Sequence, residues 1–180
     1  MRNATTGVVN EPKSRSRGEP RPQGGIAAGA AETAQTRKGA KLAKEFPLCS
    51  KGFNPMGEAL GLEFTLVGEG ASRCTLEVGK RLFNPHGVLH GAAMYSMADT
   101  GMGGALYSLL GDGELCATVE ISIYYFKPVR TGTLVCETRV VQRTRRVALL
   151  SSEIKNGDSV VARATGTFYI FEVRPEGLAG

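Results

Sequence analysis

Residues 91–110 read GAAMYSMADTGMGGALYSLL, a run in which small and apolar side chains occupy almost every position. A helix that is apolar all round belongs in the core of a protein, so we predict one buried helix here, ended by Gly111-Asp112-Gly113. Asp99 is the one carboxylate in the run. An acid in such surroundings is costly unless it is paired, hydrogen-bonded or used in chemistry. Asp99 is therefore the first candidate for a catalytic residue.

Segments with the alternation or composition of β-strands lie on both sides of this helix. A helical turn over 54–61 begins with Pro and ends with Gly. The predicted strands are 62–67 and 72–78 before the helix, and 115–126, 133–142, 146–155 and 159–171 after it. Asn156-Gly157 is a strong signal for a two-residue hairpin turn. One helix among so many strands must pack on one face of an antiparallel sheet. We predict an α+β fold in which a curved antiparallel sheet wraps a long central helix.

Charge divides the chain of 180 residues into two parts. Residues 1–45 hold nine Lys or Arg and four Asp or Glu, whereas residues 46–180 hold thirteen of each kind. The net charge of +5 therefore belongs to the N-terminal part, and the rest gives no reason to expect nucleic-acid binding. Residues 1–40 contain no aromatic residue and are rich in Gly, Ala, Pro and Arg. We predict a disordered basic tail over 1–45 and one folded domain over 46–180.

The cysteines and the hydropathy point to an intracellular protein without a metal. The two histidines and four cysteines show no zinc-ligand spacing, so we expect buried reduced thiols, no metal and no cofactor; the cysteines are Cys49, Cys74, Cys116 and Cys136. No apolar run reaches the ~20 residues that span a bilayer, and no signal peptide follows Met1. We therefore expect a cytoplasmic protein with no membrane partner.

A polar loop leads into the predicted helix and carries a family motif. Residues 84–91 read NPHGVLHG, and residues 98–100 read ADT. This pattern resembles PaaI-like acyl-CoA thioesterases of the hotdog-fold superfamily, in which an Asn opens the loop, His-Gly-Gly begins the helix and an acid follows two turns later. The resemblance covers roughly residues 55–171 and includes the strand up to Pro128. One departure is Ala92, which replaces the second Gly of His-Gly-Gly.

The resemblance implies hydrolysis of an acyl-CoA and assigns roles to individual residues. Asp99 would act as a general base on water or attack directly to form an anhydride, and Thr118 would orient the water. The Gly91 N–H would polarise the thioester carbonyl, and Asn84 would fix the carbonyl or the water. These roles suit the residues, because a helix start offers unsatisfied N–H groups and a positive dipole end. His90 is a weaker catalytic candidate in the same loop.

The resemblance also implies partners. In hotdog dimers the acid and the oxyanion donors come from different protomers, so we expect an obligatory homodimer and a tetramer built from two of them. Basic residues near one predicted hairpin tip and one strand end are candidates for holding CoA phosphates, because Arg and Lys pair with phosphate; these residues are Lys127, Arg130, Arg143, Arg145 and Arg146. The alternative is a solvated, charged turn.

Other interpretations of the same residues stay open. Asp99 could be a structural acid, Asn84 could form only an Asx turn, and Thr118 could be an ordinary strand residue. His90 could only shape its loop, and His86 could be a surface residue. At the level of function, the alternatives are a non-catalytic acyl-CoA sensor and a hotdog hydratase or dehydratase with His90 as base. The sequence leaves the acyl group open.

Overall fold

The computed structural model describes residues 52–173. The predicted basic tail over 1–45 and Cys49 lie outside the described residues. The described chain begins with a short helix, α1 (Pro55–Leu60), whose start is capped by Asn54. The Asn54 side chain accepts a hydrogen bond from the Gly57 N–H at 3.0 Å, and Gly61 ends the helix in the left-handed conformation with φ 75°. This is the helical turn that the sequence predicts.

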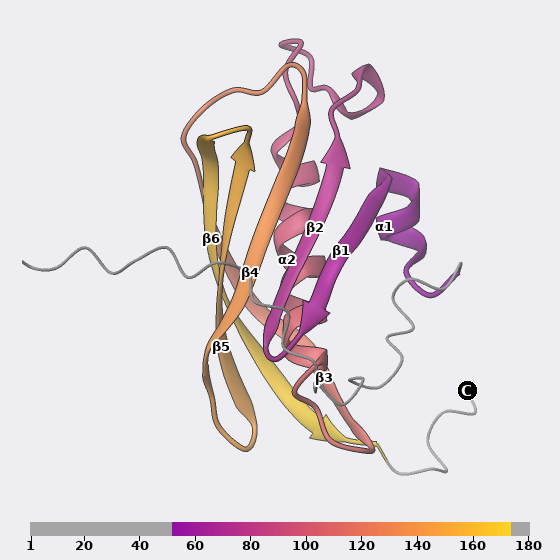
Figure 1. Ribbon diagram of the computed structural model, residues 1–180, viewed down its shortest axis with the longest axis vertical. Coiled ribbons are helices and arrows are strands. Elements are labelled where there is room, and N and C mark those ends of the chain that lie inside the picture. The colour runs from indigo at the N-terminus through magenta and orange to yellow at the C-terminus, as the bar shows by residue number, and fades with distance from the viewer. Residues whose placement is uncertain (1–51, 174–180) are drawn as a thin grey trace, which may run out of the picture. The chain divides into compact units, whose positions relative to one another are not determined.

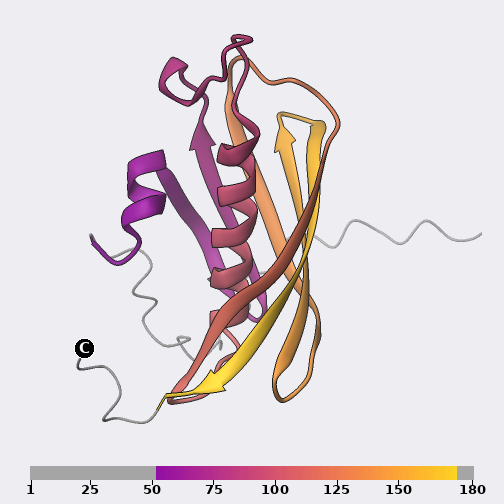
Figure 2. The same cartoon turned by 180° about the vertical axis from the view of Figure 1, so that it is seen from behind.

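Six antiparallel strands form one sheet (Figure 1). Their bounds are β1 (Leu62–Gly68), β2 (Ala71–Glu77), β3 (Glu114–Tyr125), β4 (Thr133–Arg143), β5 (Val147–Asn156) and β6 (Ser159–Glu172). The order across the sheet is β1-β2-β4-β5-β6-β3, so the strand that follows the helix forms the far edge. Figure 2 shows the long helix on one face of this curved sheet. The predicted α+β hotdog architecture is confirmed.

The long helix, α2 (Gly91–Tyr107), ends three residues before the predicted Leu110. The Ser108 hydroxyl donates to the Ala105 carbonyl at 2.7 Å and accepts a hydrogen bond from the Gly70 N–H at 2.8 Å. The Leu109 N–H then bonds to the carbonyl three residues back, that of Leu106. A contact with the β1–β2 turn thus replaces the last helical turn, and sequence periodicity does not reveal such a contact.

The core lies between α2 and the inner face of the sheet. Met97, Met102 and Leu106 are fully buried, and they face apolar side chains from four strands, among them Leu76, Leu134, Leu150 and Ile154. Cys74 and Cys136 lie opposite each other on β2 and β4 as buried free thiols. Their mutual hydrogen bond and burial raise the pKa of the Cys74 thiol. The apolar strand sequences predicted this burial.

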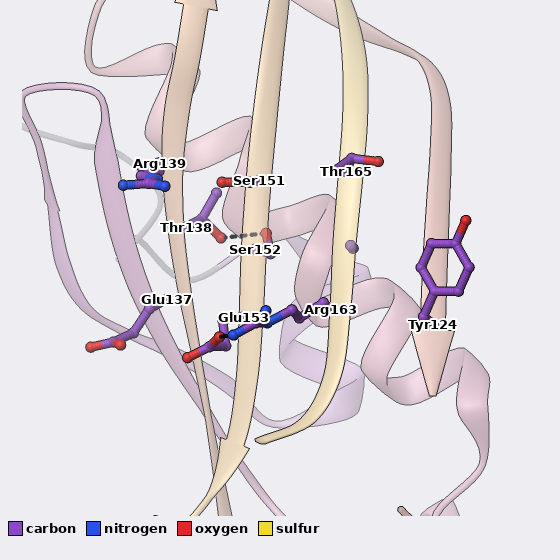
Figure 3. Close-up of a pocket in the computed structure, with 10 residues that line it drawn as sticks. Tyr124, Glu137, Thr138, Arg139, Ser151, Ser152, Glu153, Arg163 and Thr165 are labelled. Carbon is purple, nitrogen blue, oxygen red and sulfur yellow. Dashed lines mark hydrogen bonds and ion pairs between the residues drawn. The ribbon is translucent and has the colours of Figure 1, made fainter. Parts of the chain in front are cut away.

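A small polar cluster lies in this core beneath the middle of α2. The Ser72 hydroxyl donates to the Gly101 carbonyl at 2.7 Å. Thr138 and Ser152 share a hydrogen bond between their hydroxyls at 2.7 Å, which Figure 3 shows as a dashed line. A Cβ atom at Gly101 would lie 2.8 Å from Thr138 Oγ1. Glycine therefore allows the helix to approach the sheet closely at this position.

The outer face of the sheet carries a chain of ion pairs. Glu137 accepts from Arg73 at 2.6 Å and from Lys155 at 3.0 Å. Lys155 also pairs with Glu153 at 3.1 Å, and Glu153 pairs with Arg163. A hollow of about 540 Å³ opens beside these residues, and Figure 3 shows Glu153 and Arg163 pointing toward each other on it. Both acids that line this hollow, Glu137 and Glu153, are engaged in these ion pairs.

The described part of the chain contains neither a membrane-spanning helix nor a cluster of metal-binding side chains. No helix within residues 52–173 is both long and apolar enough to cross a membrane. In the same range, no group of three or more His, Cys, Asp or Glu side chains is arranged to hold a metal ion.

Candidate active site

The loop before α2 is held by its own polar residues. Asn84 Oδ1 accepts from the His86 N–H at 2.9 Å and from the Val88 N–H at 3.4 Å, which is an Asx-type turn. The loop is tied to the body of the domain by the Leu89 N–H, which donates to the Val129 carbonyl at 2.8 Å. The amide oxygen of Asn84 is thus engaged in the loop. Its amide nitrogen is the part of the side chain left to donate to a ligand.

His90 caps the start of α2. Its Nδ1 accepts a hydrogen bond from the Ala92 N–H at 3.0 Å, so the neutral ring carries its proton on Nε2. A ring nitrogen occupied as a helix cap is not available to take a proton from a substrate. The geometry therefore favours the loop-shaping interpretation of His90 over the role of a base.

The first N–H of the helix is in a different situation. The Gly91 N–H makes no hydrogen bond to any atom of residues 52–173, whereas the next two N–H groups bond to His90. The Tyr125 hydroxyl donates to the Gly91 carbonyl at 3.1 Å, and a Cβ atom at Gly91 would lie 3.2 Å from Tyr125 Cζ. Burial, with Tyr95 adding to it, raises the pKa of Tyr125, which keeps its hydroxyl protonated. Gly91 thus offers a free donor at a helix N-terminus, which suits an anion.

Asp99 lies two turns further along α2 and is held by β3. The Thr118 hydroxyl donates to Asp99 Oδ1 at 2.8 Å. The register of β3 against β6 shifts between Thr118 and Glu120, so a bulge lies directly after Thr118. A bulge re-aims the neighbouring side chains. The carboxylate is half-buried rather than buried, because the face of α2 opposite the core is open. This corrects the expectation of a helix buried on every side.

The Asp99 carboxylate opens into a cavity of about 340 Å³ between α2, β3 and the segment before α1. Its lining mixes polar side chains with small and aromatic ones: Phe53, Asn54, Asp99, Thr100, Gly103, Gly104, Tyr107, Cys116, Ala117, Thr118 and Phe168. Burial, with the Asp99 charge adding to it, raises the pKa of the Cys116 thiol, so Cys116 is a neutral wall of the cavity. Thr118 and Asp99 form a hydrogen-bonded pair in this mixed lining.

The structure does not bring all five predicted site residues together. Asp99 and Thr118 share a cavity, but its lining does not include Asn84, His90 or Gly91. Gly91 and Asp99 are eight residues apart on one straight helix, which separates them by about 12 Å. One carbonyl group cannot contact both within a single chain.

The predicted CoA-binding residues fall into two groups at opposite ends of β3. Arg143, Arg145 and Arg146 lie at the β4–β5 turn, where Arg143 pairs with Glu114 at 2.7 Å and the Arg146 guanidinium donates to the Tyr169 hydroxyl at 3.1 Å. Lys127 and Arg130 follow the other end of β3. There the Lys127 ammonium donates to the Ser159 hydroxyl at 2.6 Å, and Arg130 is exposed.

Sequence reasoning missed several residues of the cavity. Tyr107 lies eight residues after Asp99, so the helical period could have placed both on one face. Phe53 and Phe168 reach the cavity from segments far away in the chain, and no local pattern marks them. The Tyr125 hydroxyl, which contacts Gly91, is likewise a long-range partner.

The chain is similar to known proteins. The family model described as "Thioesterase superfamily" matches residues 86–163. A candidate esterase of Archaeoglobus fulgidus is 32% identical over 114 residues, which cover 62% of this chain and 72% of the relative. The proofreading thioesterase EntH of Cronobacter turicensis is 34% identical over 82 residues, covering 44% of this chain and 60% of that protein.

A solved structure agrees with these sequence matches. It is that of a mutant of the phenylacetic acid degradation protein PaaI from Thermus thermophilus, which superposes with a TM-score of 0.60 at 27% identity. The match covers 64% of this chain and 97% of that one. The fold, the motif loop and the sequence matches lead to one conclusion: the chain belongs to the thioesterase superfamily.

Proposed function

We propose that this protein hydrolyses the thioester of an acyl-CoA to a free acid and CoA. The observation that carries the proposal is the Asp99 carboxylate, held by the Thr118 hydroxyl at 2.8 Å in a cavity that aromatic side chains line in part. An acyl chain needs apolar walls, and its thioester carbon needs an oxygen nucleophile beside them. In this proposal the aromatic walls receive the acyl chain and Asp99 serves the carbon.

Two routes are consistent with this geometry. In one, Asp99 accepts a proton from a water molecule as the water oxygen attacks the thioester carbon, and the C–S bond breaks to release the CoA thiolate. In the other, Asp99 attacks that carbon itself, the C–S bond breaks to release the CoA thiolate, and water then hydrolyses the resulting anhydride to the free acid and the Asp99 carboxylate. In both routes the Thr118 hydroxyl occupies Oδ1 and leaves Oδ2 of Asp99 as the reacting oxygen.

The oxyanion donor in this proposal is the free Gly91 N–H at the start of α2. Because about 12 Å of helix separate Gly91 from Asp99, the donor that serves Asp99 belongs to a second copy of the chain. The open edge of the sheet supports a dimer through β3. Val119 and Tyr124 on this strand are 64% and 65% exposed, and a long apolar edge strand is normally paired or covered. The tetramer stays an expectation.

The other two candidate functions are less compatible with the site. A hydratase would need His90 as its base, but Nδ1 of His90 caps the helix. A non-catalytic acyl-CoA sensor needs no reacting carboxylate beside its apolar cavity, whereas Asp99 stands there with one oxygen unoccupied by Thr118. Intact recovery of acyl-CoA after long incubation with the protein would favour the sensor.

The five basic residues divide into two proposed phosphate-binding groups. Arg130 and Lys127 follow the end of β3 near the start of α2, and this end also offers the Gly91 N–H. In the other group, Arg143 pairs closely with Glu114 at 2.7 Å, whereas the exposed Arg145 has only a long pair with Glu172 at 3.9 Å, and Arg146 donates to the Tyr169 hydroxyl. Charge-reversal variants of each group, assayed for the KM of the acyl-CoA, would tell the groups apart.

The decisive experiment is Asp99→Asn, assayed by release of CoA thiol across a panel of acyl-CoA substrates. We expect kcat to fall by about two orders of magnitude or more, because the amide neither accepts the proton nor attacks carbon. Asp158→Asn makes the same chemical change in the exposed β5–β6 turn and should keep wild-type activity. Equal activity of Asp99→Asn and the wild type would remove Asp99 from the mechanism.

A further inference from the structure

One glycine in the interior of α2 has no packing reason to be glycine. Glycine weakens a helix relative to alanine, so its presence there normally reflects a close approach by another part of the chain. Gly101 has such a reason in Thr138. At Gly103, a Cβ atom would meet no heavy atom of residues 52–173 within 4 Å. The missing side chain at Gly103 therefore leaves an open space rather than a tight contact.

That open space is the cavity of Asp99. Gly103 lies four residues after Asp99, and residues four apart occupy the same face of a helix. Both residues line the cavity of about 340 Å³. The aromatic side chains of Tyr107, Phe53 and Phe168 line the same cavity. A side chain at position 103 would stand in this cavity, one helical turn from the Asp99 carboxylate.

We propose that Gly103 determines the size of the acyl group that the site accepts. This inference rests on the function proposed above. An acyl chain whose thioester carbon lies at Asp99 extends along α2 past Gly103 toward Tyr107, over the stretch of helix that has no side chain. One methylene of pocket length is worth about 10- to 200-fold in selectivity. Even a methyl group at position 103 should therefore change the preferred chain length measurably.

The competing explanation is that a second copy of the chain packs against Gly103. A subunit contact would also favour glycine, since small residues let helices approach closely. The two explanations differ in what a side chain at position 103 changes. A filled pocket changes the substrate profile and keeps the oligomer, whereas a blocked contact changes the oligomer first.

The test compares wild type, Gly103→Ala and Gly103→Leu on straight-chain acyl-CoA substrates from two to sixteen carbons. We expect kcat/KM for the longest good substrate, relative to the shortest, to fall about tenfold or more in Gly103→Ala. The fall should be larger in Gly103→Leu. The melting temperature of Gly103→Ala should rise, because alanine favours the helix. The mass of the oligomer in light scattering should equal that of the wild type.

Gly101→Ala is the matched control, with the same change two residues away on the core face. It should lower the melting temperature and leave the chain-length profile unchanged. Parallel profiles for the wild type and both Gly103 variants would overturn the inference, and so would a smaller oligomer in either variant. If instead the wild type hydrolyses no acyl-CoA of the panel, the proposed function itself has failed.

Discussion

The two long faces of α2 differ in what they require of a side chain. On the face toward the sheet, Met97, Met102 and Leu106 are fully buried, and Gly101 lets the helix lie against Thr138. On the opposite face, Asp99 and Gly103 border an open cavity. Glycine therefore occurs on both faces for different reasons. At Gly101 a side chain would collide with Thr138, whereas at Gly103 a side chain would enter open space.

The difference separates the face of α2 that packs in the core from the face on which the proposed substrate would lie. The polar groups of the core face all have hydrogen-bond partners, since no buried side-chain nitrogen or oxygen among residues 52–173 lacks one. The cavity face carries the Asp99 carboxylate, a glycine at position 103 and aromatic side chains. Features of this kind weaken a domain and persist where function uses them. Variants that affect one face and spare the other test this division.

The largest effect is expected on the core face, from Gly101→Ala. Its new Cβ atom would lie 2.8 Å from Thr138 Oγ1, which is too close, so the buried Thr138 side chain or α2 must shift. Overpacking of this kind costs about 1–3 kcal/mol of the free energy of unfolding, which urea denaturation measures. Activity per folded molecule should be retained. A variant as stable as the wild type would show that the core face tolerates a side chain there.

An intermediate effect is expected on the cavity face, from Thr118→Val. The variant loses the hydroxyl that donates to Asp99 Oδ1 and keeps the shape of the side chain. We expect kcat to fall about tenfold, equivalent to about 1.4 kcal/mol in the barrier, while the free energy of unfolding changes by less than about 0.5 kcal/mol. Thr165→Val, on the outer face of β6, is the matched control and should retain full activity. Unchanged kcat in Thr118→Val would make Thr118 an ordinary strand residue.

The elements of this fold were predictable because their signals are local. Strand alternation, the Asn156-Gly157 turn and the glycines after α2 each act within a few residues. The end of α2 was not predictable, because Ser108 bonds to Gly70, which lies 38 residues earlier in the chain. A tertiary contact of this kind overrides the local pattern.

The candidate site divides in the same way. Asp99 stood out as an acid in an apolar run, and the resemblance added Thr118 as the residue that would orient the water; the hydrogen bond of 2.8 Å between the two side chains is seen only in the structure. The roles of both residues stay predictions. Phe168 joins the cavity only through the pairing of β6 with β3 across the sheet, where it lies opposite Thr118. No pattern within either strand indicates that pairing, so this wall of the cavity could not be predicted from the sequence.

The smallest effect on the free energy of unfolding is expected from Glu137→Gln, on the outer side of the sheet and away from both faces of α2. Hydrogen bonds from Lys155 and Arg73 hold the pKa of Glu137 below its ordinary value of 4.5. Glu137 therefore stabilises the folded chain above about pH 4.5, and this stabilisation is lost as the pH falls through the lowered pKa. Because the Glu137 side chain is 39% exposed, Glu137→Gln should cost at most about 1 kcal/mol at pH 7.

The pH dependence separates this ion-pair effect from a packing effect. The difference in the free energy of unfolding between wild type and Glu137→Gln should shrink toward zero between pH 5 and strongly acidic pH, as measured by urea denaturation at each pH. Glu63→Gln is the control, because the Glu63 carboxylate on the same outer face makes no ion pair within residues 52–173. A difference for Glu137→Gln that stays constant down to pH 2 would mean that the side chain contributes through its shape and not its charge. Activity at pH 7 should be unchanged in both variants, since neither Glu137 nor Glu63 lines the cavity of Asp99.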